Sequence, residues 1–405
     1  MSNSDHGKPI IISHNGASGV YPDCTDLSYQ QAVKDGSDYI DCPVQVTKDG
    51  TLICMSSVNL MDITTVATSL LSSRTSVIPE IVNGPGIFTF NFTWEEIQKN
   101  LKPAISNPEI NYMLHRNPLY KNAGKFMTLP DFLSFAKDKD LSGIVINIEN
   151  AAFLAEKLGY SITDGVMKAL QGSGYSNHTN QEVMIQSQNS SVLIKFKQQS
   201  KYKLVYMVDE SISDIDNTSM RDIKQFAHAV SISKQSIYPE NEQFLIGETK
   251  LVQKLQSAGF AVYAYLFMNE FVSQPWDFWS DPTVEINMYV KGAGVDGIIT
   301  DFPGTAATYK RNSCLKLGDQ APAFMSPVQV GGLMQIMDPL AKPPTLAPMP
   351  SLLANDVVEP PLPPASLKPS TGESAVPPAS QPSQGQRCVA SAFVSLVLLC
   401  GSLLV

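Results

Sequence analysis

The chain has 405 residues, with 38 acidic against 29 basic side chains and a net charge of -9. A surface that follows nucleic-acid phosphates needs a basic excess or a basic stripe, and the chain has neither, so nucleic acid is excluded as a partner. Apolar and charged residues mix as in a globular domain up to residue 317, whereas Pro, Ser, Ala and Gln dominate 318–387. We expect a globular domain over 1–317 and a disordered Pro/Ser-rich spacer over 318–387.

Short β-branched runs alternate with helical patterns along the globular part, which indicates parallel βα units. Strands are expected at 9–13, 39–46, 51–55, 143–148, 182–186, 203–207, 227–232, 261–267 and 297–300. Helices are expected at 26–35, 128–137, 163–172, 190–200, 249–258 and 283–292. This α/β pattern predicts a (β/α)8 barrel with an insertion at about 61–125. A doubly wound open sheet is the alternative, although no GxGxxG motif opens its first unit.

Polar residues follow or end several of the strand runs. In a barrel, catalytic side chains gather at the C-terminal ends of the strands, which is where His14, Asp41, Glu149 and Asp301 fall. An imidazole with two or three carboxylates at a barrel mouth suits a hard divalent cation and a phosphate ester. Asp301, together with Asp296, is more readily explained as a residue that braces the last strand.

Four segments in register resemble motifs of glycerophosphodiester phosphodiesterases. They are HNGASGVYPD from His14, DYIDCPVQVTKDGTL from Asp38, INIEN from Ile146 and GAGVDGIITDFP from Gly292. With the Pro-rich tail and apolar C-terminus, the chain resembles the plant glycolipid-anchored cell-surface branch. The resemblance implies a TIM barrel of the phospholipase C-like phosphodiesterase type. Members of that branch carry two tandem domains, and this chain resembles the second alone.

The resemblance implies metal-dependent hydrolysis of glycerophosphodiesters to an alcohol and glycerol 3-phosphate. Calcium or magnesium is held in the family by three carboxylates, and two histidines act as general acid and base. By this match His14 is the first histidine, and Asp41 and Glu149 are metal ligands. Pro43 stands at the third ligand position and cannot ligate through its side chain. Ser56 replaces the second histidine, and serine cannot hand over a proton near neutral pH.

Other family positions also differ. The phosphate-binding arginine is Asn15 here, and a lysine after the third-strand glutamate is Ala151. Asn15, Ser56 and Tyr265 are the expected substrate-binding residues. These substitutions predict a degenerate site, and from the family resemblance we expect a weakly active phosphodiesterase. The alternative is a non-catalytic cell-surface module that binds an anionic wall glycan or a partner during cell-wall organisation.

The C-terminal segment 388–405 is uncharged and apolar, and it follows a polar spacer. This order is typical of a GPI-anchor signal, and a membrane-spanning helix is the alternative. We therefore expect a protein anchored through lipid at the extracellular face of the plasma membrane or in the cell wall. The N-terminus has no signal peptide, which predicts a partial or truncated sequence.

Four cysteines lie before the spacer. Cys24, Cys42, Cys54 and Cys314 can pair in three ways in an oxidising compartment, or they stay as buried thiols. Lys48-Asp49-Gly50, between the second and third strand runs, predicts a hairpin-like turn.

Overall fold

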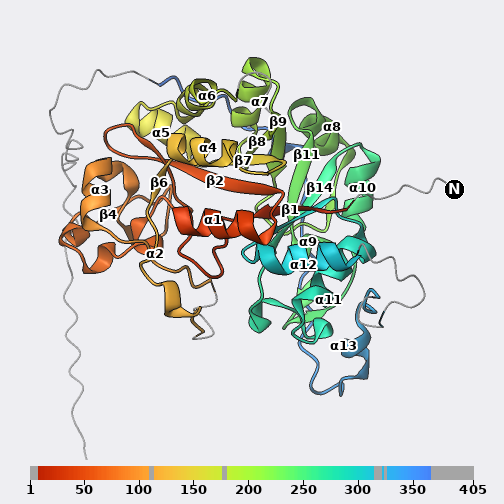
Figure 1. Ribbon diagram of the computed structural model, residues 1–405. Coiled ribbons are helices and arrows are strands. Elements are labelled where there is room, and N and C mark those ends of the chain that lie inside the picture. The colour runs from red at the N-terminus through yellow and green to blue at the C-terminus, as the bar shows by residue number, and fades with distance from the viewer. Residues whose placement is uncertain (1–7, 109–113, 176–179, 314–321, 323–325, 366–405) are drawn as a thin grey trace, which may run out of the picture. The chain divides into compact units, whose positions relative to one another are not determined.

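The computed structural model describes residues 8–108, 114–175, 180–313, 322 and 326–365. Its central feature is a closed barrel of parallel strands, because β1 pairs with β15 on one side and with β2 on the other (Figure 1). The barrel strands are β1 Ile10–Ser13, β2 Tyr39–Val46, β7 Gly143–Ile148, β8 Glu182–Ser187, β9 Lys203–Met207, β11 Ala229–Ser233, β14 Ala261–Phe267 and β15 Gly297–Thr300. The predicted (β/α)8 barrel is confirmed, and the open sheet is wrong.

Helices form the outer layer of the barrel (Figure 1). They are α1 Asp26–Asp35, α4 Leu129–Lys137, α5 Ala151–Leu158, α6 Ile162–Gly172, α7 Ser190–Gln199, α8 Asn217–Phe226, α10 Leu251–Ser257, α11 Pro282–Asn287 and α12 Pro303–Ser313. Side chains at their starts explain several boundaries: Thr25 caps α1 in a capping box with Ser28, and Thr128 caps α4. Helix α1 ends at Gly36, whose φ of 96° suits glycine. The helices α5, α8 and α12 were not predicted.

One layer of side chains fills the barrel interior. Each barrel strand contributes one member: Ile12, Tyr39, Val145, Met184, Val205, Ala229, Tyr263 and Ile299. Parallel strands are buried on both faces, which explains why every residue of β2 is buried. Packed layers of this kind make a barrel interior a core rather than a pore. The layer therefore supplies a solid floor beneath the C-terminal ends of the strands.

A hairpin extends the sheet beside β2. Strand β3, Leu52–Cys54, runs antiparallel to β2 after the turn at Lys48–Gly50, which confirms the predicted turn. A disulfide joins Cys42 to Cys54, whereas Cys24 is a buried thiol. Cys314 lies outside the described residues. The insertion that follows contains α2 Leu60–Ile63 and α3 Trp94–Asn100 and has a small apolar core of its own.

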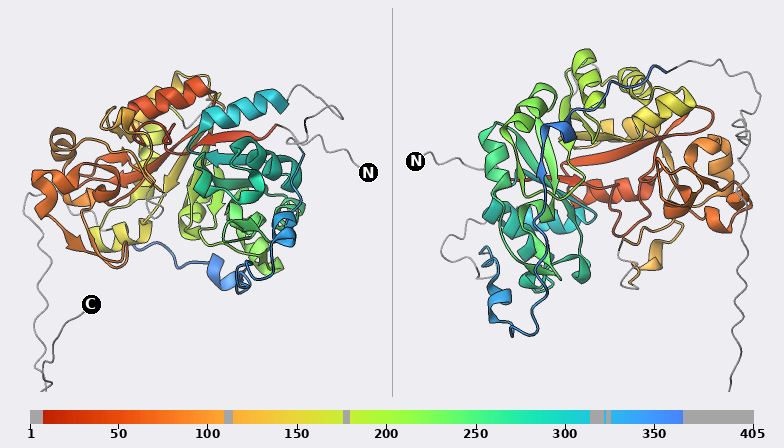
Figure 2. Two further views of the ribbon diagram at one scale, coloured as in Figure 1. Left: turned by 90° about the horizontal axis from the view of Figure 1, so that it is seen from below. Right: turned by 180° about the vertical axis from the view of Figure 1, so that it is seen from behind.

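Part of the predicted disordered spacer is folded onto the barrel. The segment contains α13 Gly332–Ile336, β16 Ser351–Leu352 and α14 Ala354–Val357. Strand β16 pairs with β10, Asp214–Ile215, and Val357 is fully buried. In the right-hand view of Figure 2 this segment, in blue, crosses the green elements. The domain boundary expected at 317 is therefore corrected to about residue 365, because a few apolar side chains and backbone hydrogen bonds suffice to dock this Pro-rich segment.

The segment 388–405, where the sequence predicts a GPI-anchor signal, lies outside the described residues. Among the helices that the structure does describe, none combines the length and apolar character needed to cross a bilayer.

Candidate functional site

A cavity of about 300 Å³ opens above the interior layer, at the C-terminal ends of the strands. Ile12, Val145 and Ile299 of that layer form part of its lining. All six residues that the sequence singled out for catalysis, metal binding or substrate binding line this one cavity. They are His14, Asn15, Asp41, Ser56, Glu149 and Tyr265. The motifs, which are far apart in the sequence, thus converge as the barrel prediction requires.

His14 follows β1 and pairs with Asp301, which follows β15. The Nδ1 atom of His14 lies 2.7 Å from Oδ1 of Asp301, and 37% of the imidazole side chain is exposed. Burial alone would lower the pKa of His14, but the bond to Asp301 and the charges of Asp301, Asp41 and Asp23 raise it to about 9. His14 is therefore an imidazolium at neutral pH, which suits it to donate a proton.

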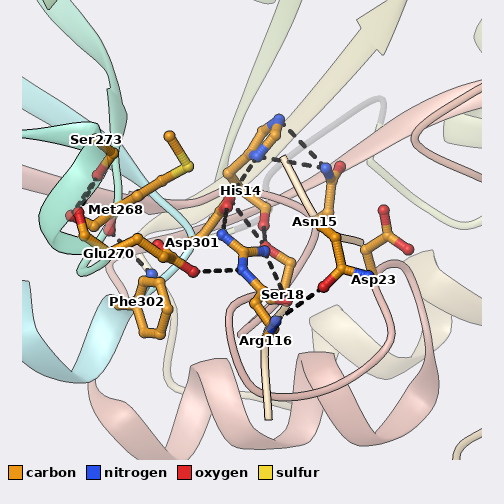
Figure 3. Close-up of polar contacts among 12 residues, drawn as sticks. His14, Asn15, Ser18, Asp23, Arg116, Met268, Glu270, Ser273, Asp301 and Phe302 are labelled. Atoms are coloured by element: carbon orange, nitrogen blue, oxygen red, sulfur yellow. Dashed lines mark hydrogen bonds and ion pairs between the residues drawn. The ribbon is translucent and has the colours of Figure 1, made fainter. Parts of the chain in front are cut away.

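Arg116 holds Asp301 from the other side (Figure 3). Its Nη2 donates to Oδ2 of Asp301 at 2.6 Å, and its Nε donates to Oε1 of Glu270 at 2.6 Å. Its Nη1 donates to the carbonyl oxygen of Ser18 at 3.2 Å, and only 3% of the arginine side chain is exposed. Burial raises the pKa of Asp301, but His14 and Arg116 outweigh that effect and lower it. A continuous chain of charges thus runs from His14 to Glu270.

The structure corrects the interpretation of Asp301 as a brace of the last strand. Its carboxylate binds His14 and Arg116, whereas Asp296 does brace neighbouring backbone by accepting from the amide of Val262 at 2.8 Å. Arg116 was missed because it lies in the insertion, outside every motif. No periodicity or spacing in the sequence links it to the site.

Two carboxylates of the cavity come from neighbouring strands. Asp41 lies in β2 and accepts from the backbone amide of Asn15, while Glu149 follows β7 and accepts from Nδ2 of Asn147 at 2.8 Å. Burial raises the pKa of Asp41 to about 6 and also raises that of Glu149. Pro43 lies two residues beyond Asp41, and it lines the same cavity.

These residues do not make up the metal-ligand set that the resemblance implies. Calcium takes six to eight oxygen ligands, and magnesium requires a near-ideal octahedron. The cavity offers the carboxylates of Asp41 and Glu149, but Pro43 supplies no side-chain oxygen. Within the described ranges, no three His, Cys, Asp or Glu side chains form a group that could hold a metal ion.

Ser56, which stands at the position that the resemblance assigns to a second histidine, forms a pair with Asp23. The Oγ atom of Ser56 donates to Oδ2 of Asp23, which is 6% exposed. Burial raises the pKa of Asp23 to about 6, although the Ser56 bond and the charge of His14 oppose the shift. Ser56 itself lines the cavity, so it connects a buried carboxylate to that space. Asp23 titrates close to neutral pH and was not among the predicted site residues.

Tyr265 lies in β14 and borders the cavity beside Leu266. Its hydroxyl donates to the carbonyl oxygen of Val208 at 2.5 Å. The hydroxyl is thus occupied by backbone, and the ring is the part of Tyr265 available to a ligand.

Comparisons with known proteins identify the family and the fold of the chain. A sequence model described as the Glycerophosphoryl diester phosphodiesterase family matches residues 14–305. The chain is 48% identical over 394 residues to glycerophosphodiester phosphodiesterase GDPDL1 of Arabidopsis thaliana, covering 96% of this chain and 51% of the relative. It is 48% identical over 390 residues to GDPDL3 of the same plant, with the same shares covered. The chain therefore spans about half the length of these curated relatives.

Solved structures resemble the barrel. A putative glycerophosphoryl diester phosphodiesterase from Silicibacter pomeroyi aligns with a TM-score of 0.55 at 14% identity, covering 75% of this chain and 94% of that one. The Oleispira antarctica phosphodiesterase OLEI02445, solved with the product sn-glycerol-3-phosphate, aligns with a TM-score of 0.50 at 16% identity, covering 74% and 96%. At such identities these matches establish the fold alone. The sequence matches establish more: this chain belongs to the glycerophosphoryl diester phosphodiesterase family.

Proposed function

We propose that the chain hydrolyses glycerophosphodiesters to an alcohol and sn-glycerol 3-phosphate. The observation that carries this proposal is the pair of titratable groups at one cavity. His14 has a pKa raised to about 9, and Asp23, linked to the cavity through Ser56, has a pKa raised to about 6. Groups whose pKa values lie on either side of neutrality are suited to act as general acid and general base.

The proposed reaction assigns one proton transfer to each group. Water attacks phosphorus and gives its proton to the Ser56 hydroxyl, which at the same time passes its own proton along its hydrogen bond to the carboxylate of Asp23. Ser56 thus relays a proton and ends as a neutral hydroxyl, and Asp23 is the base, so the step does not require serine to act as an acid of its own. The bond between phosphorus and the alcohol oxygen breaks, and the imidazolium of His14 gives its proton to that oxygen. Each transfer of this kind contributes about 10²- to 10⁴-fold in rate. The products are the free alcohol and glycerol 3-phosphate.

The same site predicts slow turnover. Stabilisation of the charge on the phosphoryl oxygens is usually the largest catalytic contribution. Here His14 is the cation that lines the cavity, and Asn15 occupies the position of the family's arginine. A calcium or magnesium ion would have only Asp41 and Glu149 as carboxylate ligands, so we expect weak binding and assign no step to it.

Release of glycerol 3-phosphate from glycerophosphocholine by the full chain tests the proposal. We expect metal-free turnover above the buffer rate and a loss of most of it in Asp23→Asn. Pro43 and Ser56 favour the second candidate, a non-catalytic binding module. Tight binding of the diester with no release of product by the wild type would support that candidate instead.

We also infer that this domain is the second of two in a longer protein held at the extracellular face of the plasma membrane or in the cell wall by a GPI anchor. The Cys42–Cys54 disulfide supports an oxidising compartment, and the greater length of the plant relatives supports another domain. Release of the full-length protein from membranes by a phosphatidylinositol-specific phospholipase C tests the anchor. Retention after that treatment would contradict it.

A further inference from the structure

We propose that a second cavity at the barrel mouth binds a cationic, ammonium-bearing head group on the alcohol side of the substrate, an inference that rests on the proposed function. This cavity has a volume of about 650 Å³ and lies beside β11 and β14. Tyr265 and Leu266 line both this cavity and the one that contains His14. A diester with its phosphorus near His14 can therefore extend one arm past Tyr265 into the second cavity.

The charges around the second cavity favour a cation. Lys234 lines it, but its Nζ donates to Oε1 of Glu285 at 2.6 Å and to the carbonyl oxygen of Ser273 at 3.0 Å. Glu285 is fully buried, so this pair neutralises the lysine. The carboxylates of Glu240 and Glu242 then make the net charge of the lining negative.

Glu240 is held in partly buried surroundings. Burial raises its pKa to about 7; the charge of Lys234 opposes that shift, and the charges of Glu285 and Asp277 add to it. A cation bound beside Glu240 would stabilise the carboxylate form and offset the cost of its burial. A neutral polyol would bring no such compensation, so the two head-group classes should differ in affinity.

Tyr265 adds an aromatic surface between the two cavities. Its hydroxyl donates to the carbonyl oxygen of Val208, and this hydrogen bond restricts the position of the ring. Ammonium groups are attracted to the face of aromatic rings, and quaternary ammonium ligands are often bound by aromatic side chains. Tyr265 lines the same cavity as Glu240 and Glu242, so one cavity offers an ammonium group both a ring and carboxylates.

The rim of the cavity is a strained and well-held hairpin. Strands β12, Glu240–Asn241, and β13, Phe244–Leu245, are joined by Glu242 and Gln243, whose φ angles are 49° and 65°. Such conformations are unfavourable for residues other than glycine and are found at ligand clamps when neighbouring contacts enforce them. Here the backbone amide of Trp276 donates to the carbonyl oxygen of Gln243 at 2.8 Å, and Nε2 of Gln243 donates to that of Val272 at 2.7 Å.

The experiment compares two diesters that differ in head-group charge. We would measure kcat/KM of the full chain on glycerophosphocholine and on glycerophosphoglycerol, for the wild type and the double variant Glu240→Gln/Glu242→Gln. The wild type should have the higher kcat/KM on glycerophosphocholine. In the double variant the ratio of the two kcat/KM values should fall roughly tenfold. Glu95→Gln, a change of the same kind on an exposed side chain elsewhere, should keep the wild-type ratio. A ratio that is the same in all three proteins would overturn the proposal.

The aromatic contribution is tested by a second pair of variants. Tyr265→Leu removes the ring and should reduce the preference for glycerophosphocholine, whereas Tyr265→Phe keeps the ring and should retain it. If the two variants have equal ratios of kcat/KM for the two diesters, the ring does not contribute to the proposed subsite.

Calorimetric titration with the same two diesters separates this proposal from the proposed function. Without any turnover the phosphodiesterase proposal fails, but the subsite stands if glycerophosphocholine binds more tightly and the double variant abolishes the difference. Equal affinities of the wild type for the two diesters would overturn the subsite whether or not turnover is seen.

Discussion

His14 and Asp301, which stand at opposite ends of the barrel sequence, form an ion pair with Nδ1 and Oδ1 2.7 Å apart. The pair exists because β1 and β15 are neighbours in the closed sheet, so the ends of the first and last strands meet. The pKa of His14 is raised from its ordinary value of 6.5 to about 9. The contribution of the ion pair to the stability of the fold is therefore fully present below pH 6.5, and it is lost as the pH rises through about 9.

The substitution Asp301→Asn should lower the pKa of His14 from about 9 to near or below its ordinary value, because burial then acts with less opposition. The measurement is an NMR titration of the His14 ring protons. His228, whose pKa is lowered by burial and by nearby lysines, serves as an internal control and should not change. If His14 still titrates near 9, the carboxylate is not the cause of the raised pKa.

The substitution Arg116→Met should destabilise the fold by about 3–5 kcal/mol, because it removes the cation that binds the partly buried Glu270 and leaves the buried Asp301 with His14 alone. Urea denaturation of the full chain measures the loss in the free energy of unfolding. The matched control is Arg74→Met, which breaks the solvent-exposed pair with Glu96 and should cost at most about 1 kcal/mol. Similar costs for the two variants would show that Arg116 is not an internal clamp.

The disulfide between Cys42 and Cys54 should contribute about 3 kcal/mol, because it closes a short loop in the unfolded chain. A reductant should therefore lower the urea midpoint of the wild type but not that of Cys54→Ser. An equal response of both proteins to the reductant would contradict the pairing.

The substitution Pro43→Asp should tighten calcium binding at least tenfold, since it adds a third carboxylate on the face that Asp41 shares. Calorimetric titration of calcium measures the effect. Pro43→Ala removes the same ring without adding an oxygen and should bind calcium as weakly as the wild type. If the Asp and Ala variants bind equally, position 43 does not face the two carboxylates.

The barrel and its cavity could be predicted from the sequence because their signals are local. Each β-branched run followed by a polar residue marks one strand end, and barrel closure brings such ends together. This places His14 and Glu149, which follow β1 and β7, around one space without any knowledge of their contacts. Asp41 lies within β2 and lines the same space.

What the sequence did not predict depends on contacts between distant segments. Arg116 reaches Asp301 from an insertion that has no regular pattern, and Asp23 becomes a titratable group near neutral pH only through its burial beside Ser56. Likewise, the composition of 318–387 indicates disorder, yet Leu352 and Val357 dock on the barrel. Overall composition does not record a few well-placed apolar side chains.

The proposed reaction depends on His14 as the acid and on the Ser56–Asp23 pair as the base. The most direct test is the pH dependence of kcat/KM for glycerophosphocholine with the wild type, Asp23→Asn and His14→Gln. Wild-type activity should rise through about pH 6 as Asp23 loses its proton and fall through about pH 9 as His14 loses its own. Each variant should be slowed by about 10²-fold or more and should lose its own limb of the profile. If the wild type and both variants share one rate and one pH profile, neither His14 nor Asp23 is the acid or base.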